Sequence, residues 1–280
     1  MPIVYACITP HGAQILPELA GEHMETLAPT RTAMEEIGRR MTAARPDVIV
    51  VATPHGLRLE GYNAVVTAAY TEGRMEGPGG VVEASFACDR TLARDIVHRA
   101  AGAGLPVVGC NYGALDGPAS LVPLDWGALI PLYFMGARTG QSPADRPQVV
   151  LVGPTRDIPL PELARFGQVI AEAAAACGKR VGFVASADQA HAHDPHGPYG
   201  FDPAAAEYDA RVVDIVRRDR LEELFGLPAD LVERAKPDSL WQMIMLYGVG
   251  QHTPLRGEFL SYQVPSYFGM LCASYTPAAG

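Results

Sequence analysis

Three apolar runs in this chain, each typical of a β-strand, lead directly to a histidine. The runs cover residues 3–9, 48–53 and 181–185, and the histidines that follow them are His11, His55 and His191. In an open α/β sheet, ligands bind in the crevice beyond the carboxyl ends of the strands. We therefore expect the three imidazoles to gather at that edge around one metal ion or one substrate.

Strand-like and helix-like segments alternate over most of the 280 residues, which predicts an α/β fold. We expect a single domain over residues 1–280, with a central, mostly parallel sheet flanked by helices and a metal site at the carboxyl ends of the strands. The expected helices cover 32–44, 89–101, 161–177 and most of 204–250, and the further strands 63–70, 106–109, 149–153, 259–264 and 268–275. A turn is expected at 77–80, a buried segment at 127–135, and loops too short to link domains at 138–147 and 192–203.

The composition is that of an ordinary globular protein, with 48% hydrophobic and 19% charged residues. A net charge of −9 without a basic run argues against nucleic-acid binding, and no apolar stretch is long enough to span a membrane. The five cysteines are scattered and never spaced as Cys-x-x-Cys, which fits reduced thiols and excludes a zinc finger. Cys110 is the only one in a loop-like setting, and a structural role is favoured for it. Without a signal-peptide pattern at Met1, we expect a cytoplasmic protein.

His11 and His55 share the sequence Thr-Pro-His-Gly. A single loop histidine is more often a polar surface residue than a ligand. Here the proline stiffens the exit from the strand, and the glycine lets the backbone approach a neighbour closely. The repeated motif therefore favours metal binding by the two histidines together.

The segment 188–196 holds three histidines and two aspartates. The plain alternative is a solvated polar loop, and that description suits His193 and His196. His191 lies nearest the strand end, where a neutral imidazole can act as an acid or a base near neutral pH.

Two histidines and one carboxylate form the usual ligand set of non-haem Fe(II) sites with open positions. Asp238 precedes an apolar, helix-like run and is the first candidate for the carboxylate. An equally good reading is that Asp238 caps this helix, because aspartate is favoured at the N-cap. Glu233 and Glu258 are the other carboxylates that we consider.

Seven short segments, spread over nearly the whole chain, carry a family resemblance. They are residues 10–12, 54–56, 124–127, 130–132 and 186–191, the Asp238 helix, and residues 267–270. In this order and spacing, the chain resembles the class III extradiol ring-cleavage dioxygenases, the superfamily of protocatechuate 4,5-dioxygenase beta subunits.

The resemblance implies a metal, Fe(II) or alternatively zinc, held by His11, His55 and Asp238, with His191 as the acid/base group. The third ligand of this family is typically glutamate, so aspartate here is one methylene shorter. Members commonly have Leu-Asp-His-Gly where this chain has Leu-Asp-Trp-Gly, which places Trp126 at a histidine position. We expect Trp126 and His193 to contact the substrate.

The function implied is an Fe(II)-dependent extradiol dioxygenase that opens a catechol-like or aminophenol-like ring with O2, as a homo-oligomer or with a small second subunit. A rival is a Memo-like relative that binds metal without this catalysis, which Trp126 favours slightly. The Memo-like pattern has a cysteine among its ligands, however, and none stands at position 238. A third alternative is a metal-dependent hydrolase, since zinc in the same triad activates water.

Overall fold

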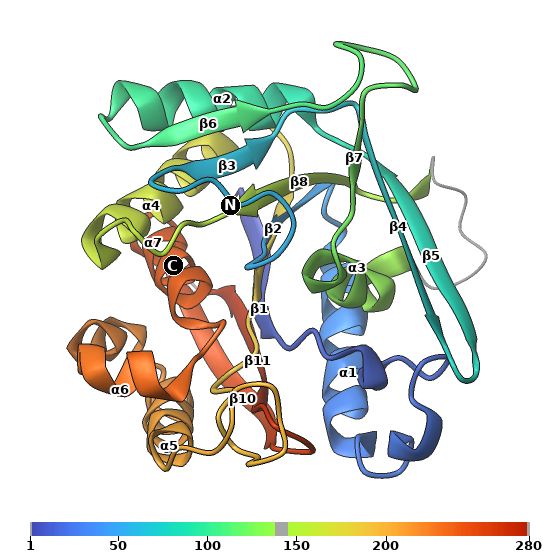
Figure 1. Cartoon of the computed structure of the whole chain (residues 1–280). Coiled ribbons are helices and arrows are strands. Elements are labelled where there is room, and N and C mark those ends of the chain that lie inside the picture. Colours follow the sequence, from blue (N-terminus) through green and yellow to red (C-terminus); the bar gives the residue numbers. More distant parts are fainter. Residues whose placement is uncertain (1, 138–144, 279–280) are drawn as a thin grey trace.

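The computed structural model describes residues 2–137 and 145–278 and has the expected α/β architecture (Figure 1). The loop expected at 138–147 lies largely outside the described residues. Among the helices of the described part, none is both long and apolar enough to cross a membrane.

The core of the molecule is a mostly parallel sheet with the strand order β10-β11-β1-β9-β2-β8-β3-β6. Strands β1, β9, β2 and β8 are parallel, whereas β10 and β11 form an antiparallel extension at one edge. The bounds are β1 Ile3–Thr9, β2 Val48–Ala52, β3 Asn63–Val66, β6 Val107–Cys110, β8 Gln148–Gly153, β9 Val181–Ser186, β10 Leu255–Gln263 and β11 Met270–Pro277. Because β9 lies between β1 and β2, the three strands that precede the histidines are neighbours with a common carboxyl edge.

Helices cover both faces of this sheet, as its largely apolar central strands require. In β2, Val48, Val50 and Ala52 face one side, while Ile49 and Val51 face the other. The first side packs against α2 Arg90–Gly102, α4 Leu160–Ala176, α5 Ala204–Arg217, α6 Ala229–Ala235 and α7 Leu240–His252. The second packs against α1 Ala28–Ala44, α3 Trp126–Leu132 and the π-helical turn η3 Tyr133–Ala137. The expected buried segment at 127–135 is therefore helical.

A second, three-stranded sheet was not expected from the sequence. It has the order β5-β4-β7, with β4 Tyr70–Gly77, β5 Gly80–Ala87 and β7 Leu121–Pro123. The predicted strand at 63–70 is in fact two strands, because β3 ends at Val66 and Tyr70 already belongs to β4. In β4 the exposed charged residues Glu72, Arg74 and Glu76 alternate with the less exposed Thr71, Gly73, Met75 and Gly77, so only one face of this hairpin packs on the core. The turn at 77–80 joins β4 to β5 as expected.

The structure also contains the short 3-10 helices η1 Ala13–Ile15, η2 Gly21–His23 and η5 Leu221–Gly226. The helical region expected at 204–250 is interrupted at η5 and again before α7, close to the predicted break at 226–228. Residues 192–203 contain no helix or strand, as predicted. The chain thus delivers one loop after each of β1, β2 and β9, and the start of α7, to a single edge of the large sheet.

Candidate metal centre

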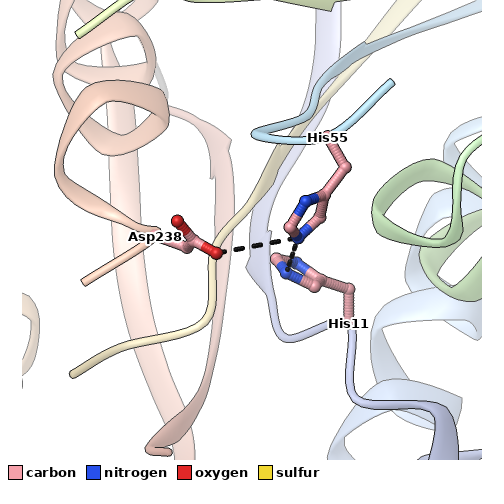
Figure 2. A group of neighbouring side chains, drawn as sticks. All are labelled: His11, His55 and Asp238. Atoms are coloured by element: carbon pink, nitrogen blue, oxygen red, sulfur yellow. Dashed lines mark hydrogen bonds and ion pairs between the residues drawn. The ribbon is translucent and has the colours of Figure 1, made fainter. Parts of the chain in front are cut away.

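The rings of His11 and His55 meet edge to face beyond the ends of β1 and β2 (Figure 2). The two Nε2 atoms are 3.1 Å apart. Two nitrogens that each lie about 2.1 Å from one ion, at nearly a right angle, are separated by about 3 Å. The observed spacing therefore fits two imidazoles that share an ion.

Asp238 brings a carboxylate to the same place, with Oδ2 at 3.6 Å from Nε2 of His55. His11, His55 and Asp238 each contribute one possible ligand atom, and these three atoms lie within 4.8 Å of one another. In the part of the chain that the structure describes, no other group of three such side chains could hold a metal ion. Helix α7 begins at Leu240 with Ser239 as its N-cap, so the carboxylate does not cap the helix. It faces the histidines, and its second oxygen binds Arg156.

The hydrogen bonds around His11 determine which of its two ring nitrogens carries the proton. The buried Ser186 hydroxyl donates its one hydrogen to the carbonyl oxygen of Gly127. At Nδ1 of His11, 2.9 Å away, the hydroxyl oxygen can then only accept. The proton of a neutral His11 is therefore on Nδ1, and the lone pair is on Nε2, which lies 3.1 Å from Nε2 of His55 and 3.2 Å from Oδ2 of Asp188. This arrangement is typical of metal-binding histidines.

Both imidazoles are neutral near pH 7, the form that binds metal. Burial lowers the pKa of His11 well below its usual range, and the neighbouring His55 and His191 lower it further. Burial also lowers the pKa of His55 to about 4, although the Asp238 carboxylate opposes this shift. The backbone N–H of His11 donates to Asp188, a buried carboxyl whose pKa burial raises well above its usual range.

His191 lies in the same cavity, beyond the end of β9. Its Nδ1 is 2.9 Å from the carbonyl oxygen of Lys236, which can only accept, so Nδ1 carries the proton of the neutral ring. The free Nε2 is 3.9 Å from Oδ2 of Asp238. Burial lowers the pKa of His191, with Asp238 opposing the shift, so a neutral base points into the cavity.

His193 does not line this cavity. Its Nε2 is 2.8 Å from the buried carboxylate of Asp209, which also accepts from the Tyr262 hydroxyl and from the backbone N–H of Ala190. The structure gives no support to the expectation that His193 contacts the substrate, because its Nε2 is bound within the protein and its side chain is not among those that line the cavity. Its bond to Asp209 instead helps to hold the segment that carries His191.

The cavity has a volume of ≈ 430 Å³, and Trp126 forms part of its wall. The indole lies over His55 with ring centroids 4.1 Å apart and planes inclined by 31°, and it is 48% exposed. Trp126 is the first residue of α3, and Asp125 caps this helix by accepting from the N–H of Ala128. A larger hollow of ≈ 700 Å³ lies on the three-stranded sheet, but none of its lining residues is a histidine.

The glycine after His55 is required by the local geometry. Gly56 has φ +77°, and a Cβ there would lie 2.8 Å from Oδ2 of Asp125. Asp125 in turn accepts from the Thr53 hydroxyl at 2.7 Å, and that hydroxyl oxygen is 3.3 Å from the N–H of His55. The Thr-Pro-His-Gly turn and the Leu-Asp-Trp-Gly segment therefore fit together, and they fix where the His55 ring lies.

A family model described as the catalytic LigB subunit of aromatic ring-opening dioxygenase matches residues 5–271. The chain belongs to the LigB family. The match covers all the residues of the candidate centre, and the membership that the motifs indicated is thereby confirmed. The LigB family generally uses a non-haem metal, and the donor set of His11, His55 and Asp238 fits one.

Two further proteins are similar to this LigB-family chain. The protein CA_C1420 of Clostridium acetobutylicum is 25% identical over 259 residues, which are 91% of this chain and 54% of that protein. The chain thus spans about half the length of this curated relative. An uncharacterised Escherichia coli protein, JW3007, has a crystal structure that superposes with a TM-score of 0.59 at 15% identity, covering 97% of this chain and 99% of that one. The second likeness shows the fold alone.

The sequence analysis assigned no role to three residues at or near the candidate centre, Arg156, Tyr267 and Phe268. Two carboxylates that it considered as ligands, Glu233 and Glu258, lie away from the centre. Arg156 follows the end of β8, the same kind of position that drew attention to the histidines. Tyr267 and Phe268 line the cavity. They belong to the motif at residues 267–270, from which the sequence alone predicts no role for either side chain. Glu233 is exposed on α6, and Glu258 pairs with Arg40 on the outer surface, so neither carboxylate is a member of the centre.

Proposed function

We propose that this chain is an Fe(II)-dependent extradiol dioxygenase that opens a catechol-like or aminophenol-like ring with O2. One observation carries the proposal: two imidazole Nε2 atoms and a carboxylate oxygen lie within 4.8 Å of one another at the wall of a ≈ 430 Å³ cavity. Two histidines and one carboxylate on one face of an ion leave positions free for other ligands, as in non-haem Fe(II) oxygenases.

His11 and His55 would hold the ion through their Nε2 atoms, and Asp238 through the oxygen that faces them. Fe(II) bound there would bring O2 and the aromatic ring together and carry electrons from the ring, which is oxidised, to O2, both of whose atoms enter the ring-opened product. The protein's own part is to orient these donors and the substrate. Ser186 fixes the His11 ring through Nδ1, and Arg156 holds the other oxygen of Asp238.

His191 would act as the acid and base of the reaction. Its Nε2 is unprotonated when the ring is neutral and faces the cavity 3.9 Å from Oδ2 of Asp238. It can accept the proton that a ring hydroxyl loses when the substrate binds, and return that proton as the ring opens. The Lys236 carbonyl at Nδ1 favours the protonated ring and so supports this transfer.

Trp126 would form an apolar wall against the substrate ring. Its indole offers a π face and one N–H donor but no acceptor, so it cannot relay a proton. No group at this wall can therefore carry a proton, and His191 would be the principal proton carrier of the site. His193, bound to Asp209, has no substrate contact in this proposal.

The test is reconstitution of the metal-free protein without oxygen, with Fe(II) in one sample and Zn(II) in another. Each sample then receives air and a panel of catechols and aminophenols, and O2 uptake and the absorbance of ring-opened product are followed. We expect uptake with Fe(II) and none with Zn(II). Iron binding without O2 uptake for any compound would overturn the dioxygenase, whereas hydrolysis of added esters by the zinc form alone would favour the hydrolase.

Two variants connect the activity to the centre. Asp238→Asn removes the charged donor and is expected to lose iron and activity together. Asp230→Asn makes the same change at an exposed position of α6 and should leave both unchanged. If Asp238→Asn keeps its iron, the carboxylate is not a ligand.

A further inference from the structure

Among the residues that the structure describes, those that wall the cavity beside the candidate centre include several aromatic rings and no lysine or arginine. Its rings, other than those of the histidines, belong to Trp126, Tyr199, Tyr267 and Phe268. The described lining residues that can carry charge near neutral pH are thus the histidines and the carboxyls Asp188 and Asp238. Such a wall offers no ion-pair partner to an anionic group of a ligand.

Two arginines, Arg58 and Arg156, lie near enough to act electrostatically on His55, and the guanidinium of Arg156 is already engaged. Arg156 binds Asp238, and its Cζ lies 4.4 Å from the centre of the Trp241 ring. Arg156 does not line the cavity, and neither does Arg58, which is exposed beyond the turn of His55. A carboxylate on the substrate would therefore lose hydration inside the cavity without gaining a charged hydrogen bond.

Two tyrosine rings form a corner of the cavity beside the acid/base histidine. The centroids of Tyr199 and Tyr267 are 6.5 Å apart with planes inclined by 43°, and the Tyr199 centroid is 5.6 Å from that of His191. Tyr199 is 57% exposed. Aromatic faces carry negative potential and attract ammonium groups within about 6 Å of the ring centre.

We propose that the substrate ring carries a neutral or cationic side chain and no carboxylate, with an ammonium group preferred at the Tyr199–Tyr267 corner. This inference rests on the proposed ring-opening function and specifies its substrate class. The ring would chelate the ion through its two heteroatoms, and the side chain would extend past His191 to the tyrosines. The net charge of −9 acts in the same direction, since it repels anions and attracts cations at long range.

The test compares three catechols of similar length, with an aminoethyl, a propyl or a carboxyethyl side chain. Their dissociation constants are measured without oxygen on the Fe(II)-loaded protein by optical titration, so that binding is read apart from turnover. We expect the aminoethyl compound to bind about tenfold more tightly than the carboxyethyl compound, with the propyl compound between them. Equal or tighter binding of the carboxylate would overturn the inference.

Substitutions at the corner show whether the aromatic face is responsible. Tyr199→Leu should weaken binding of the aminoethyl compound about two- to fivefold and leave the propyl compound nearly unchanged. Tyr199→Phe keeps the face and should keep the preference. If Tyr199→Leu weakens both compounds equally, the corner does not recognise charge.

Met75 of β4 allows the opposite experiment, because it lines the same cavity and is not one of the proposed ligands. Met75→Lys adds the missing cation and should reverse the order of the aminoethyl and carboxyethyl compounds, whereas Met75→Leu should retain it. If the order is unchanged with lysine in place, charge in the cavity does not select the substrate and the inference fails.

The outcomes separate the inference from the function on which it rests. If all three catechols bind and support O2 uptake but the carboxylate is preferred, the dioxygenase stands and the substrate class is wrong. If none of the three binds to the iron-loaded protein, both proposals fall.

Discussion

Arg156 binds one carboxylate oxygen of Asp238, while the other oxygen of that carboxylate lies 3.6 Å from Nε2 of His55. The guanidinium itself rests on the Trp241 ring, so its position is fixed on two sides. An aspartate is one methylene shorter than the glutamate typical of the resembled family. The arginine gives this shorter side chain a defined orientation, with only one oxygen turned toward the histidines.

Arg156→Gln is therefore expected to lower the affinity for Fe(II) or Zn(II) by about 10- to 100-fold, as is usual when a group that orients a ligand is lost. Competition against a chelating dye measures this affinity without any substrate. Arg165→Gln removes a comparable, half-exposed arginine that pairs with Glu172 on α4, and it should leave the affinity unchanged. The same affinity in both variants would show that Arg156 does not position Asp238.

Ser186→Ala should also weaken metal binding by about 10- to 100-fold, because His11 loses the acceptor that keeps its proton on Nδ1. The matched control is Ser274→Ala, which removes another buried serine hydroxyl, one that accepts from Tyr5. That variant should lose stability but keep its affinity for metal. If both serine variants bind metal as the wild type does, the tautomer of His11 is not set by Ser186.

The sequence predicted that three histidines would gather at one edge of the sheet, because strand-like runs and the residues after them are local signals. His11, His55 and His191 come together as the parallel order β1-β9-β2 requires. For Asp238 the sequence left two alternatives open, since a carboxylate before a helix can cap it or face away. Only the packing of α7 against the rest of the fold decides between these orientations.

Other features could not be derived because they depend on partners that are distant in sequence. The position of His193 in the sequence does not reveal that its Nε2 is bound by Asp209 of α5. The hairpin β4–β5 was missed because its polar, glycine-containing strands carry a weak apolar pattern. Arg156 follows a strand end, but the sequence gives no sign that its partner is Asp238, because only the fold brings positions 156 and 238 together.

The stability of the metal-free protein should depend on pH through His55. A free imidazole titrates near pH 6.5, whereas burial lowers the pKa of His55 to about 4 in the folded state. Between these values the unfolded chain binds more protons than the folded one, so stability must fall as the pH falls. Thermal denaturation of the metal-free wild type and of His55→Gln should therefore diverge between about pH 6.5 and 4. Parallel curves would show that the His55 pKa is not lowered.

His191→Ala should keep its metal and lose most of its turnover, by about 100- to 10,000-fold, if the ring moves protons and does not bind the ion. Metal content by elemental analysis and O2 uptake are measured on the same sample. His196→Ala removes an exposed histidine of the same segment and should have little effect on either. A His191→Ala protein that has lost its iron would make this residue a ligand.

Trp126→His should shift activity toward simple catechols, because it adds a group that can donate and accept a proton at the wall beside His55. The indole lies 4.1 Å from the His55 ring centroid, so an imidazole at position 126 would stand close to the proposed ion. Turnover of unsubstituted catechol should rise, and a second ionisation should enter its pH profile near neutral pH. Trp126→Phe keeps an apolar wall and should show neither change. If the histidine and phenylalanine variants behave alike, the wall acts through its shape, and the absence of a proton-relaying group there does not limit the reaction.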